Sequence, residues 1–125
     1  MLKTKIAVFV SGGGTNFEAL INAQENGKIP HGEIVLMVSS SKTAYALKRA
    51  ENHGIKSVVC SKKELGSQES FEEEILKNLE ENDIQLIVLA GFMSILSKEF
   101  TKKYENRIIN IHPSLIPSFC GEGFY

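Results

Sequence analysis

The chain alternates between short runs of consecutive apolar residues and longer segments in which apolar residues recur every three or four positions. The short runs predict β-strands covered on both faces, because a strand with one wet face would alternate apolar and polar residues. The longer segments predict helices with one buried side. The predicted strands are 5–10, 33–38, 55–59, 85–90 and 107–111, and the predicted helices are 17–26, 43–52, 67–80 and 98–104.

Strand and helix alternate along the whole sequence, which predicts an α/β fold, a Rossmann-like doubly wound parallel sheet with strand order 3-2-1-4-5. Segment 85–90 is the most apolar and should be central. No repeat or linker is visible, so residues 1–125 form one predicted domain with a single core. In such a sheet, ligands bind beyond the carboxyl ends of the strands, here between strands 1 and 4.

Individual residues predict the ends and the faces of the helices. Gly27 should stop the first helix, and Ser39–Ser41 suit a turn and the N-cap of the second. The apolar stripe of the longest predicted helix should face the core, and Glu72–Glu74 should lie mainly in solvent rather than at a metal site.

Fourteen basic and fifteen acidic residues give a net charge of −1. No overall field therefore attracts the chain to nucleic acid or to an anionic membrane. No apolar run is long enough for a signal peptide or a membrane span, so we expect a cytoplasmic protein. Cys60 and Cys120 lie far apart and lack the spacing of metal ligands, which indicates reduced thiols and no metal.

A glycine-rich segment, Ser11–Asn16, follows the first predicted strand and precedes a helix. Glycines let backbone N–H groups approach an anion at a helix N-terminus, and Thr15 and Asn16 could add side-chain hydrogen bonds. The segment lacks the third glycine of a dinucleotide-binding loop, because Phe17 stands there. It is typical either of a monophosphate site or of a tight turn alone.

The segment after the fourth predicted strand, 91–96, is apolar although the chain leaves the sheet there. Its side chains could cover a flat, partly aromatic ligand, or they could fold back onto the core.

Asn110 and His112 end the fifth predicted strand, which arrives through Ile108 and Ile109 as a buried strand. Their spacing places both side chains on one face, and Pro113 and Pro117 fix the loop that follows. An amide and an imidazole held in this way form a hydrogen-bond donor and a proton-transfer group. A histidine that caps loop carbonyls is the alternative, but three unusual segments at one edge of the sheet favour a functional site.

These segments resemble phosphoribosylglycinamide formyltransferase, of the formyltransferase superfamily, along essentially the whole chain. The most specific parts are Ser11–Asn16, Ala90–Met93 with Ile95 and Leu96, and Asn110–Pro117. The resemblance implies transfer of a formyl group from 10-formyltetrahydrofolate to the amine of glycinamide ribonucleotide, in de novo purine (IMP) biosynthesis. It implies no metal and no covalent nucleophile.

The resemblance also implies roles for individual residues. Asn110 and His112 would be catalytic: both would stabilise the negative charge on the formyl oxygen, with donors of this kind typically worth roughly 3 kcal/mol each. The other implied residues are Gly14, Thr15 and Asn16 for the substrate phosphate, Phe92, Met93, Ile95 and Leu96 with Asn110 for the folate, and Pro113 and Ser114 for the substrate loop. Ser94 and Gln68 stand where some members carry arginine, so contacts to the folate tail and the substrate should differ.

The family's catalytic aspartate lies beyond this region, and the sequence stops at Tyr125. We therefore expect a fold that is truncated after the fifth strand, with residues 1–125 as the N-terminal, phosphate-binding domain and the C-terminal part of the family fold absent. The fifth strand should then expose an edge and apolar side chains. The sequence leaves a homodimer open.

Two other functions remain open. A formyltetrahydrofolate hydrolase would use water in place of the amine, although the glycine segment argues against it. A non-catalytic nucleotide- or phosphate-binding module would need only the glycine segment, and truncation favours it.

Overall fold

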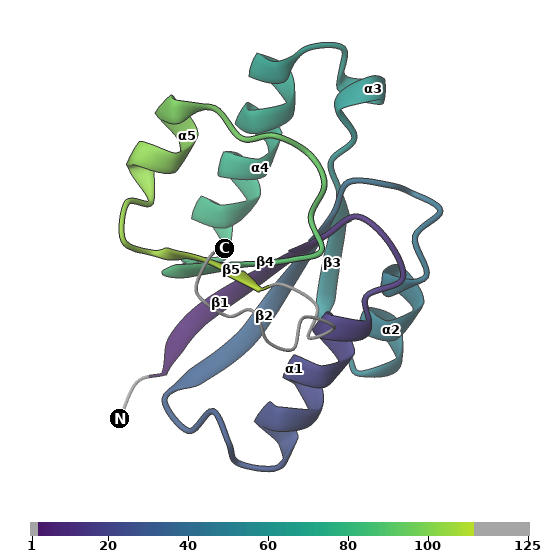
Figure 1. Cartoon of the computed structure of the whole chain (residues 1–125), viewed down its shortest axis with the longest axis vertical. Helices are drawn as coiled ribbons and strands as arrows, with labels where there is room; N and C mark the ends of the chain where they lie inside the picture. Colours follow the sequence, from purple (N-terminus) through teal and green to yellow (C-terminus); the bar gives the residue numbers. More distant parts are fainter. Residues whose placement is uncertain (1–2, 112–125) are drawn as a thin grey trace, which may run out of the picture.

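A five-stranded parallel sheet lies between two groups of helices in the computed structural model, which describes residues 3–111 (Figure 1). The sheet has the order β3-β2-β1-β4-β5. The predicted fold class and strand order are therefore confirmed. The strands are β1 (Thr4–Val10), β2 (Gly32–Ser39), β3 (Lys56–Val59), β4 (Leu86–Ala90) and β5 (Ile108–Ile111).

Two helices cover one face of the sheet and three lie on the other (Figure 1). Helices α1 (Thr15–Glu25) and α2 (Ala46–Asn52) lie on the first face. Helices α3 (Lys62–Leu65), α4 (Gln68–Glu81) and α5 (Lys98–Lys103) lie on the second. None of the helices within residues 3–111 has the length and apolar character needed to cross a membrane.

Strand β1 is the centre of the core, because residues 6–10 are all buried. Ala7 and Phe9 face α4 and α5, whereas Val8 and Val10 face α1 and α2. A strand that is buried on both faces needs apolar residues at every position, which explains the continuous apolar run in the sequence. Strand β4 is likewise an inner strand, as its apolar sequence predicted.

The start of α2 differs from the prediction. The helix begins at Ala46 rather than near Thr43, and no side chain in the described chain caps it. Ser39 closes a turn instead, since its hydroxyl donates to the carbonyl of Ser41 at 2.6 Å and accepts from the Ser41 N–H at 3.2 Å. The serines therefore confirm the turn but not the predicted N-cap. Short helix α3, capped by Ser61, was not predicted.

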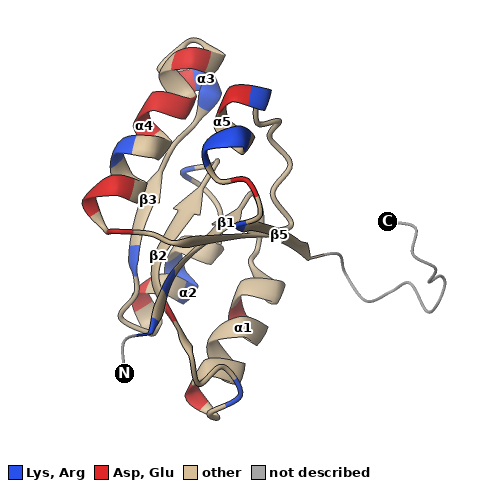
Figure 2. Cartoon of the chain, turned by 90° about the vertical axis from the view of Figure 1, so that its left-hand side faces the viewer, with Lys and Arg blue, Asp and Glu red and all other residues tan. Residues whose placement is uncertain are grey.

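Charged side chains and the described cysteine lie in different parts of the fold. Acidic and basic residues are interspersed over the helices on both sides of the sheet (Figure 2). Cys60 is a free thiol in the core, and burial, with a smaller effect of Glu74, raises its pKa to about 12. A thiol with that pKa stays protonated and unreactive at neutral pH. Cys120 lies outside the described residues.

Candidate functional site

Three loops meet at the carboxyl edge of the sheet through the side chain of Ser11. The Ser11 hydroxyl accepts a hydrogen bond from the Ser40 hydroxyl, in the loop after β2, at 2.7 Å. It also accepts the backbone N–H of Met93, in the loop after β4, at 2.7 Å. The predicted convergence of the glycine segment and the loop after β4 is therefore confirmed. In the sequence, Ser11 stands out only as part of the glycine segment, and its connecting role depends on contacts with two other loops.

The glycine segment forms a turn whose last residue, Gly14, is the N-cap of α1. Gly14 has a φ of 80°, in the left-handed region that disfavours residues with a Cβ. A Cβ at this position would also lie 2.7 Å from the Cβ of Ala46 on α2. Gly12 and Gly13 are exposed, and nothing in residues 3–111 lies within 4 Å of a Cβ added there.

The N-terminus of α1 contains the residues that were predicted to bind a phosphate. Within residues 3–111, no side chain caps the first turn of this helix, so its backbone N–H groups keep their capacity to donate. Thr15 is exposed and Asn16 is half-buried at this end. Free N–H groups and the helix dipole together favour an anion. The predicted phosphate residues Gly14, Thr15 and Asn16 thus occupy one helix terminus.

A charged cluster between α1 and α2 contacts the glycine segment. Arg49 donates from Nε to the carbonyl of Gly13 at 2.7 Å and from Nη1 to Glu18 at 3.5 Å. His53 Nε2 lies 2.8 Å from Glu18, and His53 Nδ1 lies 3.2 Å from Glu25. The sequence does not reveal this cluster, because nothing in the spacing of its residues shows that two helices bring them together.

The contacts within the cluster favour the charged forms of His53 and Glu18. The hydrogen bond to Glu18 raises the pKa of His53, against the opposing effect of burial. The same bond lowers the pKa of Glu18, with Arg49 adding to the effect. Carboxylates only accept hydrogen bonds, so an imidazole between two of them is best satisfied as imidazolium.

The loop after β4 combines inward and outward apolar side chains. Phe92 packs edge-on against Phe9 with 5.3 Å between ring centroids, and Leu96 also packs against the core. Met93 and Ile95 are 81% and 80% exposed. Two of the four residues therefore fold back onto the core, as one of the two predicted alternatives has it. The other two are exposed, and their covering of a ligand stays a prediction.

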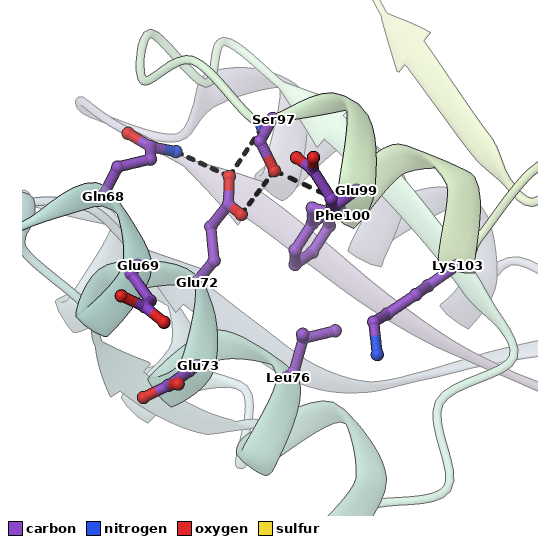
Figure 3. A pocket seen from close by; sticks show the side chains of 9 residues that line it. All are labelled: Gln68, Glu69, Glu72, Glu73, Leu76, Ser97, Glu99, Phe100 and Lys103. Carbon is purple, nitrogen blue, oxygen red and sulfur yellow. Dashed lines mark hydrogen bonds between the residues drawn. The ribbon is translucent and has the colours of Figure 1, made fainter.

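Glu72 of α4 fixes the end of this loop. Its carboxylate accepts the N–H and the hydroxyl of Ser97 and the amide of Gln68, each at 2.6 Å (Figure 3). Gln68 also donates to the carbonyl of Ile95 at 2.9 Å. The prediction that Glu72 lies in solvent is wrong, because the loop before α5 covers it and leaves it 9% exposed.

A groove of about 530 Å³ lies between α4 and α5, beside this network. Its walls include Gln68, Glu72, Leu76, Ser97, Phe100 and Lys103 (Figure 3). None of the predicted site residues that the structure describes lines the groove. We therefore place the candidate site at the carboxyl edge of the sheet and not in the groove.

Asn110 lies near the end of β5, next to the loop after β4. It pairs with Leu89 in the sheet, and Leu89 pairs in turn with Phe9 of β1. Neighbouring strands are about 5 Å apart, so Asn110 lies roughly 10 Å from the end of β1. The Asn110 residue is exposed. His112, Pro113 and Ser114 lie outside the described residues.

Strand β5 is less buried than its sequence suggested. Ile108 packs against the core, but Ile109 is 49% exposed at the edge of the sheet. The prediction of a fully buried strand is therefore wrong at Ile109, whereas the predicted exposure of apolar side chains on this edge is confirmed there.

Comparison with known proteins gives one family. A model of the formyl transferase family matches residues 4–124. The chain is 49% identical over 119 residues to "Trifunctional purine biosynthetic protein adenosine-3" of Gallus gallus. It is 39% identical over 121 residues to "Phosphoribosylglycinamide formyltransferase" of Haemophilus influenzae. A solved phosphoribosylglycinamide formyltransferase from Brucella melitensis superposes with a TM-score of 0.85 at 42% identity.

These matches cover nearly all of this chain but only part of the relatives. They include 95% of this chain and 12% of the Gallus protein, and 97% of this chain and 57% of the Haemophilus protein. The Brucella structure is covered over 62% of its chain, against 95% of this one.

Proposed function

Because the chain belongs to the formyl transferase family, we propose that it acts in the transfer of a formyl group from 10-formyltetrahydrofolate to the amine of glycinamide ribonucleotide, in de novo purine biosynthesis. The observation that supports this most strongly is the pair of hydrogen bonds made by Ser11. They bring an uncapped helix terminus and an exposed apolar loop to one edge of the sheet. The predicted cytoplasmic location and homodimer stay predictions.

In this proposal the phosphate of the ribonucleotide binds at Gly14, Thr15 and Asn16. The uncapped N-terminus of α1 provides backbone N–H donors there, and the side chains of Thr15 and Asn16 are within the same turn. A phosphate that accepts several such bonds is fixed in orientation as well as in place. The rest of the ribonucleotide would then extend along the carboxyl edge toward β4 and β5.

The folate would bind on the side of β4. Met93 and Ile95 carry exposed apolar side chains, while Phe92 and Leu96 support them from the core. Covering the flat pterin with these side chains would remove apolar surface from water on both molecules, which favours binding by about 25 cal/mol per Å². Asn110 lies beside this loop on the neighbouring strand.

Asn110 and His112 would carry the chemistry. The amine attacks the formyl carbon, so negative charge develops on the formyl oxygen and a proton must leave the nitrogen. Exposed Asn110 would donate its amide to that oxygen and orient the amine, and His112 would stabilise the same charge. The bond between the formyl carbon and N10 of the folate would then break, and the proton would finally reach N10 as it leaves. Pro113 and Ser114 would fix the loop that seats the ribonucleotide.

Calorimetric titration of glycinamide ribonucleotide tests the phosphate site. Asn16→Ala removes one hydrogen bond to a charged group, which is typically worth about 1.5 to 3 kcal/mol, so we expect affinity to fall about tenfold or more. Asn22→Ala, at an exposed position of the same helix, is the matched control and should change affinity less than about twofold. Equal affinities of wild type and Asn16→Ala would refute the phosphate assignment.

A further inference from the structure

The glycine segment rests on α2 at two consecutive residues. The Gly13 carbonyl accepts the Nε–H of Arg49 at 2.7 Å. Gly14 packs so closely on the same helix that a Cβ there would lie 2.7 Å from Ala46. Ala46 and Arg49 are three positions apart and therefore lie on one side of α2. One face of this helix thus contacts both residues before α1.

Arg49 is itself held in a fixed position. Its Nη1 lies 3.5 Å from Glu18 of α1, and its guanidinium lies 5.0 Å above the ring of Tyr45. Only 24% of the Arg49 side chain is exposed. The guanidinium therefore contacts a carbonyl, a carboxylate and an aromatic ring at once, so little conformational freedom remains to be lost when a ligand binds.

The bond to Gly13 determines where the next N–H points. In a trans peptide the C=O of one residue and the N–H of the following residue point in opposite directions. Because the Gly13 carbonyl points to Arg49, the Gly14 N–H points away from α2. A peptide between two glycines could otherwise rotate with little steric penalty, since neither residue has a Cβ.

We propose that Arg49 is a positioning residue that fixes the Gly13–Gly14 peptide so that the Gly14 N–H faces the bound phosphate. The ligand in this inference rests on the proposed function. Arg49 acts through the backbone and does not itself touch the substrate. Its positive charge could also attract the phosphate over a distance, so a test has to separate geometry from charge.

Three substitutions make this separation in a calorimetric titration with glycinamide ribonucleotide. Arg49→Gln removes the charge and the guanidinium, and we expect affinity to fall about tenfold. Arg49→Lys keeps the charge but lacks the planar group that bonds Gly13 and Glu18 together, so affinity should still fall at least about threefold. Lys48→Ala removes a charge from the neighbouring position, where the side chain pairs with Glu51 at 3.6 Å, and should cost less than about twofold.

Two results would overturn the inference. If Arg49→Lys binds as tightly as wild type, charge alone accounts for the effect. If Arg49→Gln binds as tightly as wild type, the residue has no role in binding. A similar melting temperature for the three variants and wild type should accompany the expected result.

A measurement without ligand keeps this inference distinct from the proposed function. NMR relaxation should give order parameters near about 0.85 for the Gly13 and Gly14 amides in wild type and in Lys48→Ala, and clearly lower values in Arg49→Gln. Unchanged order parameters in Arg49→Gln would overturn the positioning role. Failure of wild type to bind glycinamide ribonucleotide would instead refute the proposed function, while the order parameters would still decide how Arg49 acts on the loop.

Discussion

Gly14 combines a backbone conformation and a close approach that each disfavour a side chain. Its φ of 80° is in the left-handed region, and the Cβ of Ala46 lies 2.7 Å from where its own Cβ would be. Gly12 has neither constraint within the described chain. The three adjacent glycines therefore have different structural roles, although the sequence alone does not distinguish them.

Gly14→Ala should destabilise the protein by about 1 to 3 kcal/mol, because the left-handed conformation and the contact with Ala46 both oppose the new methyl group. Gly12→Ala should change the free energy of unfolding by less than about 0.5 kcal/mol. Urea denaturation of the two variants and wild type measures both effects. Equal denaturation midpoints for Gly14→Ala and wild type would show that the loop adapts at no cost.

At the residue scale, the sequence predicted which residues form the candidate site better than it predicted the residues that contact them. The glycine motif predicted either a monophosphate site or a tight turn, and the structure places its residues at an uncapped helix terminus. The need for glycine at position 14 arises from Ala46, and the support of Gly13 arises from Arg49. Both contacts join segments that are distant in sequence, so no local pattern could reveal them.

The loop after β4 is fixed by polar contacts along its length. Ser11 accepts the N–H of Met93, Gln68 donates to the carbonyl of Ile95, and Glu72 accepts both donors of Ser97. These bonds hold the backbone while Met93 and Ile95 extend their apolar side chains outward. A loop that is ordered before the ligand arrives loses less conformational entropy on binding.

Glu72→Ala should lower the free energy of unfolding by about 2 kcal/mol, because Ser97 and Gln68 lose a charged acceptor. Glu73→Ala, at the adjacent exposed position, is the matched control and should cost less than about 0.5 kcal/mol. Thermal or urea denaturation at neutral pH gives the comparison. An equal loss for both variants would contradict a special role of the Glu72 network.

The stability lost in Glu72→Ala should depend on pH. Burial alone would raise the pKa of Glu72, but the hydrogen bonds from Ser97 and Gln68, with the charge of Lys62, lower it below its ordinary value of 4.5. A lowered pKa in the folded state gives a stabilisation that is present above the unfolded pKa and is lost as the pH falls through the folded pKa. The stability difference between wild type and Glu72→Ala should therefore narrow below about pH 4.5.

At the element scale, periodicity predicted the buried stripe of α4 but not the burial of Glu72. Phe71, Ile75 and Leu79 are all fully buried, as their spacing indicated. Glu72 follows Phe71 at the margin of that stripe. Whether a residue at the margin is exposed to solvent depends on the segment that packs next to the helix. The loop before α5 covers Glu72. The periodicity of a helix cannot predict which other segment packs against the margin of its buried stripe.

At the scale of the whole molecule, the candidate site joins the two faces of the sheet. The glycine segment leads into α1, which packs on the face that contains Val8 and Val10. Asn110 pairs with Leu89, which packs on the opposite face with Phe92. The loops of the two halves meet at the carboxyl edge, where Ser11 accepts the N–H of Met93. The alternation of strands and helices predicted that these segments converge at the carboxyl edge, because right-handed crossovers allow few topologies. It did not predict how they are divided between the two faces.

Substitutions on the two halves of the site should therefore have separable effects. Asn110→Ala should lower the rate of formyl transfer about 100-fold through loss of one donor to the formyl oxygen. Its affinity for glycinamide ribonucleotide should stay within about twofold of wild type, because the phosphate residues belong to α1 and its N-cap. Asn16→Ala should show the reverse: weaker ribonucleotide binding, with the affinity for the folate retained.

Calorimetry with each substrate and a transfer assay on the same preparations give this comparison. Binding of the folate should weaken in Asn110→Ala even where transfer is too slow to measure, since Asn110 lies beside the loop that carries Met93. Matching losses of ribonucleotide affinity in both variants would mean that Asn110 and Asn16 bind one substrate. The phosphate site and the formyl-transfer site would then not be divided between the two faces of the sheet.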